Sequence, residues 1–131
     1  MRAKPLLALA ALAAAAIPAL AADRTERVQF ARGASSKAIA GTVRGYDSVN
    51  YLVGARAGQV LSVDLRRRGG SAYFNVWAPG ADEAIFIGSS EGNSFSGTLS
   101  AGGDYRVQVY LMRSAARRNE SSAYTLTVGV R

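Results

Sequence analysis

Apolar and polar side chains alternate along most of this chain with a period of two residues. The alternation is regular in the segments 105–111 and 124–130, where Tyr, Val and Leu are separated mostly by Arg, Gln, Thr and Gly. Glycine-rich turn signals, such as those at 68–70 and 101–104, interrupt the pattern. Short alternating segments bounded by turns are typical of strands in a sandwich or a barrel. We therefore predict an all-β fold, an antiparallel β-sandwich of about eight strands.

Two segments add detail to this prediction. The strand expected at 73–77 contains Phe74 and Trp77, and at least one of these large side chains should lie in the core. The segment 113–121 contains two consecutive alanines and does not follow the alternation. It can hold a short helical turn between the last two strands.

The first 21 residues have a different character. A basic head with Arg2 and Lys4 precedes an apolar run of about 15 residues that ends in Ala19-Leu20-Ala21. A membrane-spanning helix needs roughly 20 apolar residues, whereas a signal peptide has a shorter run followed by small residues at the cleavage site. We therefore expect 1–21 to be a signal peptide and 22–131 to be a single mature domain that begins at Ala22 or Asp23. The chain has no cysteine, and a secreted protein without disulfides fits a bacterial periplasm.

The composition argues against an enzyme. The chain has no His and no Cys, so a Ser-His-Asp triad, a thiol nucleophile and a typical structural zinc site are all excluded. The nine carboxylates do not form a recognisable catalytic pair or a calcium loop, and no phosphate-binding motif is present. We expect no cofactor and no metal.

The net charge of the chain is +7, and removal of the two basic residues in the head leaves +5. The arginines are scattered over turns and do not form one stripe, so nucleic acid is not an expected partner. No later segment is apolar for long enough to enter a membrane after cleavage of the signal.

Three predicted loops carry charge or aromatic groups: Gly45-Tyr46-Asp47, Arg66-Arg67-Arg68 and the segment 113–120. Loops on a rigid sandwich are where binding function concentrates, and Tyr and Arg are enriched among the residues that dominate interfaces. The alternative for each loop is a solubilising turn without a partner. Composition alone does not decide between the two.

Four segments resemble the family of periplasmic inhibitors of goose-type (g-type) lysozyme, in the same order along nearly the whole mature chain. They are 41–51 (GTVRGYDSVNY), 57–63 (AGQVLSV), 103–119 (GDYRVQVYLMRSAARRN) and 124–128 (YTLTV). The GYD and MRSAARRN stretches are the specific parts of the match. The strand segments are less specific, because many secreted β-sandwiches share them.

The resemblance implies a protein that is not an enzyme and that blocks the glycan cleft of a lysozyme with its loops. It implies that Tyr46, Arg113 and Arg117 contact the partner, and we include Asp47 and Arg118 from the same loops among the predicted contacts. A glycan-hydrolysing cleft carries an acidic residue as its general acid. An arginine inserted there can pair with that carboxylate, and a tyrosine can stack where a sugar ring would sit.

One position departs from the wider group of periplasmic lysozyme inhibitors, which often carry Ser-Gly-x-Tyr before the penultimate strand. This chain has Gly102-Gly103-Asp104-Tyr105, without the serine hydroxyl. We therefore expect Tyr105 to be a sheet residue, and the class of lysozyme stays open. Lysozymes are often basic, so net charge does not steer this protein to one, and the Arg66–Arg68 triplet is expected away from the interface or toward an anionic envelope.

A second resemblance gives the alternative function. The segments 57–60 and 103–107 are also similar to pre-peptidase C-terminal domains, which are accessory β-sandwiches of secreted enzymes. A domain of that kind would bind envelope material or polysaccharide and would not inhibit an enzyme. A row of exposed aromatic side chains on one sheet face would favour sugar binding. A protruding loop pair that holds Tyr46 beside Arg113 and Arg117 would favour the inhibitor.

Overall fold

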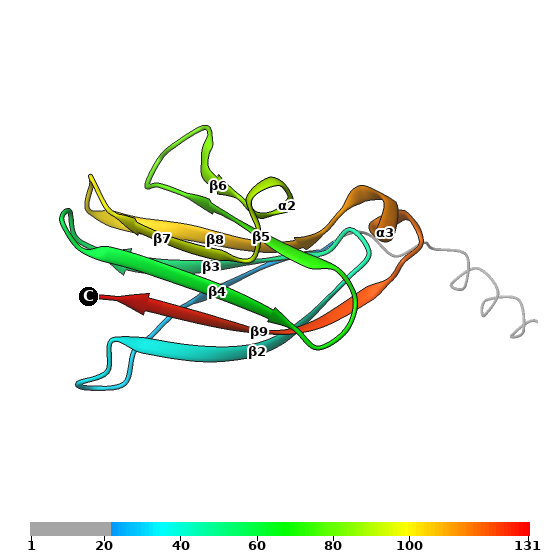
Figure 1. Cartoon of the computed structure of the whole chain (residues 1–131), viewed down its shortest axis with the longest axis horizontal. Helices are drawn as coiled ribbons and strands as arrows, with labels where there is room; N and C mark the ends of the chain where they lie inside the picture. The colour runs from blue at the N-terminus through cyan, green and yellow to red at the C-terminus, as the bar shows by residue number, and fades with distance from the viewer. Residues whose placement is uncertain (1–21) are drawn as a thin grey trace, which may run out of the picture.

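The computed structural model describes residues 22–131, which form two β-sheets packed face to face (Figure 1). Nine strands and two short helices follow one another within residues 22–131. They are β1 (Asp23–Arg27), β2 (Ser36–Arg44), β3 (Ser48–Ala55), β4 (Val60–Arg67), β5 (Ala72–Trp77), β6 (Ala84–Ile87), α2 (Gly88–Glu91), β7 (Ser94–Thr98), β8 (Gly103–Leu111), α3 (Arg113–Arg117) and β9 (Ser121–Val130). The predicted sandwich is confirmed, with one strand more than expected.

The two sheets have the strand orders β1-β3-β8-β5-β6 and β2-β9-β4-β7. Every pairing is antiparallel except that of β1 with β3, which is parallel. This pair corrects the expectation of a wholly antiparallel sandwich. Its cause is the connection: β2 lies in the other sheet, so the chain returns to the first sheet running in its original direction.

The core lies between the sheets and is built from the alternating apolar positions. In β8, for example, Tyr105, Val107, Val109 and Leu111 are buried, and the residues between them face outward. Tyr105 is 1% exposed, as expected for a sheet residue. The prediction for the fifth strand is also confirmed, because Phe74 is fully buried while Trp77 is half-buried.

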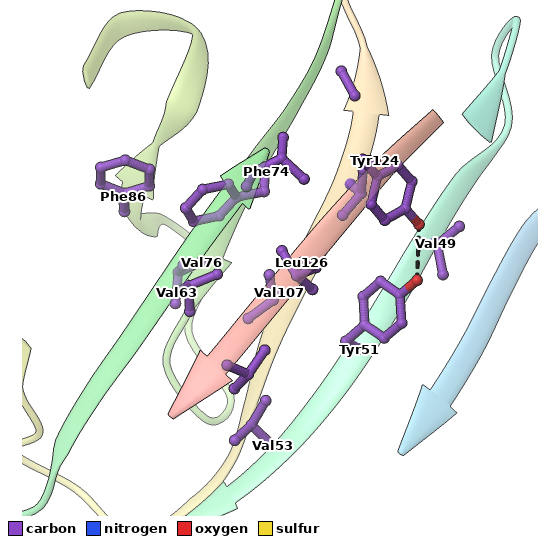
Figure 2. Packing of buried hydrophobic residues seen from close by; sticks show 14 of the residues in the cluster. Val49, Tyr51, Val53, Val63, Phe74, Val76, Phe86, Val107, Tyr124 and Leu126 are labelled. Carbon is purple, nitrogen blue, oxygen red and sulfur yellow. Dashed lines mark hydrogen bonds between the residues drawn. The ribbon is translucent and has the colours of Figure 1, made fainter. Parts of the chain in front are cut away.

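Two buried tyrosines join the two sheets within the core. The hydroxyls of Tyr51 on β3 and Tyr124 on β9 are 2.8 Å apart and form a hydrogen bond (Figure 2). Burial raises the pKa of both phenols above the usual value of tyrosine, because the phenolate would lose its hydration. Gly41 on β2 leaves room for this pair, since a Cβ there would lie 2.6 Å from the hydroxyl of Tyr124.

The helices are each a single short turn. α3 confirms the helical turn expected within 113–121. α2 was not predicted, because four residues with the sequence GSSE carry no apolar periodicity that could reveal a helix. The expected signal peptide, 1–21, lies outside the described residues. Within 22–131, no helix is both long enough and apolar enough to span a bilayer.

Candidate binding site

Three connections meet at one end of the sandwich. They are the turn between β2 and β3, the end of β8 with the α3 helix that follows it, and the start of α2. Figure 1 shows the β2–β3 turn beside α3, at the end opposite the C-terminus. Here the residues Tyr46, Ser89, Tyr110, Leu111, Met112 and Arg113 line an open hollow of about 570 Å³. The fold therefore brings Tyr46 and Arg113, which are distant in the sequence, to one place.

The β2–β3 turn presents Tyr46 to solvent. The amide of Asp47 donates to the carbonyl of Arg44 at 3.0 Å and closes the turn, and Gly45 lies in the left-handed region with φ of 59°. The amide of Gly45 donates to the carbonyl of Glu120 at 2.9 Å, so the turn is tied to the segment after α3. Tyr46 is 56% exposed, which is unusual for a side chain with so large an apolar ring.

α3 is anchored by its two alanines. Ala115 and Ala116 are buried, and the amide of Ala116 donates to the carbonyl of Met112 at 2.9 Å. Arg113 and Arg117 are four residues apart, so they lie on the same face of the helical turn, and both are exposed. Neither forms a salt bridge with any residue of the described domain. Both guanidinium groups are therefore available to a partner.

The other two predicted contacts already have partners in the domain. The carboxylate of Asp47 accepts a hydrogen bond from the backbone nitrogen of Ala22 at 2.8 Å, and Asp47 is only partly exposed. Arg118 pairs with Glu120 at 2.7 Å on the surface. The structure thus places Tyr46 and Arg113 at the hollow, with Arg117 on the same face of α3 as Arg113. Arg118 follows the end of α3, and Asp47 faces the start of the N-terminal strand.

No protein-family model matches the chain. A curated relative from Escherichia coli (strain K12), described as an inhibitor of g-type lysozyme, is 30% identical over 114 residues, which are 85% of this chain and 84% of the relative. This chain belongs to that inhibitor family. The solved structure of Aeromonas hydrophila PliG, a periplasmic lysozyme inhibitor of g-type lysozyme, is similar with a TM-score of 0.76 and 42% identity, and the match covers 86% of this chain and 100% of PliG.

The second resemblance extends to the fold. The pre-peptidase C-terminal domain of a Bacillus anthracis collagenase matches with a TM-score of 0.53 and 13% identity, over 88% of this chain and 100% of that domain. At that identity the match shows a shared β-sandwich architecture and nothing about function.

Sequence reasoning about this inhibitor-family chain missed Tyr110. Tyr110 occupies an outward position of β8, and its hydroxyl donates to the side-chain oxygen of Asn75 at 3.0 Å. The same oxygen accepts from the amide of Gly88 at the start of α2, at 3.2 Å, so Tyr110 is held in place as part of the lining of the hollow. The available signal was a tyrosine at a position where the alternation calls for a polar side chain.

The outer face of the five-stranded sheet carries the rings of Tyr73, Trp77 and Tyr110, but none of them is fully exposed, as a row that favours sugar binding would be. Tyr73 lies opposite Tyr110, with ring centroids 6.4 Å apart, and Trp77 lies opposite Arg106. These rings are half-buried, and two are covered by guanidinium groups. Arg106 lies 4.1 Å from the centre of the Trp77 ring, and Arg67 lies 5.1 Å from that of Tyr73. A sugar would have to displace these cations from the ring faces.

The position of Arg67 refines the expectation for the arginine triplet. Arg66 points outward from the four-stranded sheet, but Arg67 reaches the Tyr73 ring on the other sheet. Because Tyr73 neighbours Tyr110, one member of the triplet is connected to the edge of the binding hollow.

Within the domain that the structure describes, no three His, Cys, Asp or Glu side chains are grouped as a metal site.

Proposed function

We propose that this chain is a periplasmic inhibitor of a g-type lysozyme and that it blocks the glycan-binding cleft of the enzyme. Membership of the inhibitor family supports the target. The juxtaposition of exposed Tyr46 with the unpaired Arg113 at one hollow supports the place of contact. This juxtaposition is the single observation that carries the proposed mode of binding.

Each side chain has a role suited to its chemistry. Arg113 offers two parallel N–H donors, which match a carboxylate of the cleft. Arg117 offers a second guanidinium group with the same pair of donors, one helical turn further along α3. Tyr46 presents a flat ring that can occupy the position of a sugar. Tyr110 is part of the lining of the hollow and is held by Asn75, so it supports a rigid contact surface.

Asp47 and Arg118 have different roles in this proposal. Asp47 supports the turn that carries Tyr46, since its carboxylate faces the N-terminal strand. Arg118 stands at the rim, where a partner carboxylate would compete with Glu120 for its guanidinium. Rim pairs of this kind contribute little affinity, so Arg113 and Arg117 should dominate.

The proposal is tested by the loss of turbidity of cell-wall suspensions with g-type, c-type and i-type lysozymes, each with and without the purified mature chain. Inhibition of the g-type enzyme alone is expected. Inhibition of only the c-type or the i-type lysozyme would overturn the assigned target but would leave the proposed mode of binding in place. Absence of inhibition at micromolar protein would overturn the proposal and leave a secreted binding sandwich.

A further inference from the structure

The N-terminal strand begins directly behind the turn that carries Tyr46. β1 pairs with β3 in a register that places Asp23 opposite Ser48. The carboxylate of Asp23 accepts a hydrogen bond from the hydroxyl of Ser48. Asp23 and Ser48 thus join the start of β1 to the residue that follows the Tyr46 turn.

Ala22 makes two further contacts at this point. Its nitrogen donates to the carboxylate of Asp47 at 2.8 Å, and its carbonyl accepts from the amide of Ser48 at 3.0 Å. Ala22 therefore clamps the two residues that follow Tyr46. The clamp holds the C-terminal side of the turn, while the bond between Gly45 and Glu120 holds the other side.

The expected cleavage site lies at this same residue. Hydrolysis of the peptide bond between Ala21 and Ala22 by signal peptidase would consume one water molecule, leaving a carboxylate on Ala21 and a protonated amine on Ala22. A free α-amino group has a pKa of about 7.7–8.0 and is mostly charged at neutral pH. Cleavage there converts a neutral N–H donor beside Asp47 into a cation.

We propose that the new α-ammonium group of Ala22 forms an ion pair with Asp47 and thereby positions Tyr46 for binding. A charged donor makes a hydrogen bond roughly twice as strong as a neutral one. The mature N-terminus is then a positioning element of the binding site, and Asp47 acts through it. The part of this inference that concerns inhibition rests on the proposed function, whereas the ion pair itself does not.

The first test compares the mature chain that begins at Ala22 with the same chain acetylated on its α-amino group. Acetylation removes the charge and keeps an N–H donor, so the fold should be preserved. We expect the inhibition constant to rise about two- to fivefold, as for a partly exposed ion pair. Asp47→Asn should give a similar rise, and acetylation of Asp47→Asn should add little, because the two changes remove the same interaction.

Two variants serve as controls. Asp47→Glu keeps the carboxylate and should restore most of the sensitivity to acetylation. Asp82→Asn changes an exposed carboxylate in the loop between β5 and β6 and should leave inhibition and its sensitivity to acetylation unchanged. Mass spectrometry of the protein secreted by cells should show a chain that begins at Ala22, and a different first residue would overturn the proposal.

An unfolding measurement without lysozyme separates this inference from the proposed function. Acetylation and Asp47→Asn should each lower the free energy of unfolding, and their combined effect should be smaller than the sum. Additive effects would show that no ion pair exists. The two changes could instead be coupled in the free energy of unfolding and yet leave the inhibition constant unchanged for a lysozyme that the wild-type chain inhibits. That result would show that the ion pair exists but does not position Tyr46 for binding. If the wild-type chain inhibits no lysozyme, only the proposed function fails, and the unfolding measurement still decides the ion pair.

Discussion

Replacement of Arg113 by alanine should weaken inhibition strongly and leave the fold intact. In the proposed complex, the guanidinium group of Arg113 pairs with a carboxylate in a cleft from which water is excluded. Loss of one partner of such a pair costs about 2–5 kcal/mol of binding free energy, since the other charge stays buried and unpaired. At about 1.4 kcal/mol per factor of ten, even the lower bound raises the inhibition constant more than tenfold.

The stability of the Arg113→Ala variant follows from the same structure. Arg113 is exposed and forms no salt bridge within the described domain, so its removal should change the free energy of unfolding by less than about 0.5 kcal/mol. For a domain of this size, the melting temperature should shift by no more than about 4 °C. Alanine is also the best helix former, which favours retention of α3.

The assay is the initial rate of cell-wall lysis at a series of inhibitor concentrations, together with thermal unfolding of each variant. Arg66→Ala is the matched control, because Arg66 is an exposed arginine on the outer face of the four-stranded sheet. It should inhibit as the wild type does. An unchanged inhibition constant for Arg113→Ala would refute the assigned contact. So would an equal loss for Arg66→Ala, which would indicate a general effect of charge.

Four further predictions concern stability. Leu126→Ala should lower the free energy of unfolding by about 2–5 kcal/mol in chemical denaturation, because Leu126 is fully buried and a cavity would remain; a loss under about 1 kcal/mol would contradict this packing. Tyr124→Phe should cost about 1–3 kcal/mol by leaving the hydroxyl of Tyr51 without its partner. The pKa of both phenols is raised in the fold, so the protonated pair stabilises the native state below the unfolded pKa, and stability should fall as the pH rises above about 10; a flat alkaline stability profile would argue against the buried pair. The Arg27 guanidinium lowers the pKa of Asp104, so their surface pair contributes above the unfolded pKa of about 3.9 and is lost as the pH falls through the lowered value. Wild type and Asp104→Asn should therefore differ slightly in melting temperature at neutral pH and converge in acid, whereas a constant difference would exclude this linkage.

The alternation of side chains was sufficient to predict the sandwich and much of its core. Tyr105 is buried where the two-residue period places it, and Phe74 is the buried member of the pair Phe74 and Trp77, of which one was expected in the core. The parallel pairing of β1 could not be predicted, since the residues 23–27 are all exposed and carry no apolar pattern. α2 escaped prediction for a similar reason. Local pattern reports which face of a strand is apolar, but it does not report which strand will be its neighbour.

The candidate site was predictable only in part. The resemblance of the GYD and MRSAARRN segments pointed to Tyr46, Arg113 and Arg117, and the fold brings the first two to one hollow. Tyr110 and the role of Asp47 depend on contacts between distant segments, which the sequence does not display. The bond from Ala22 to Asp47, for example, exists because β1 lies against β3 in a particular register.

Competition between this protein and a glycan tests the central claim most directly. The affinity of the mature chain for g-type lysozyme would be measured by calorimetry at increasing concentrations of a soluble peptidoglycan-derived oligosaccharide that fills the cleft. If Tyr46 and Arg113 occupy that cleft, the apparent dissociation constant should rise linearly with the concentration of free oligosaccharide, because only the sugar-free enzyme can bind the protein. An unchanged dissociation constant at saturating oligosaccharide, with both molecules bound at once, would contradict the account.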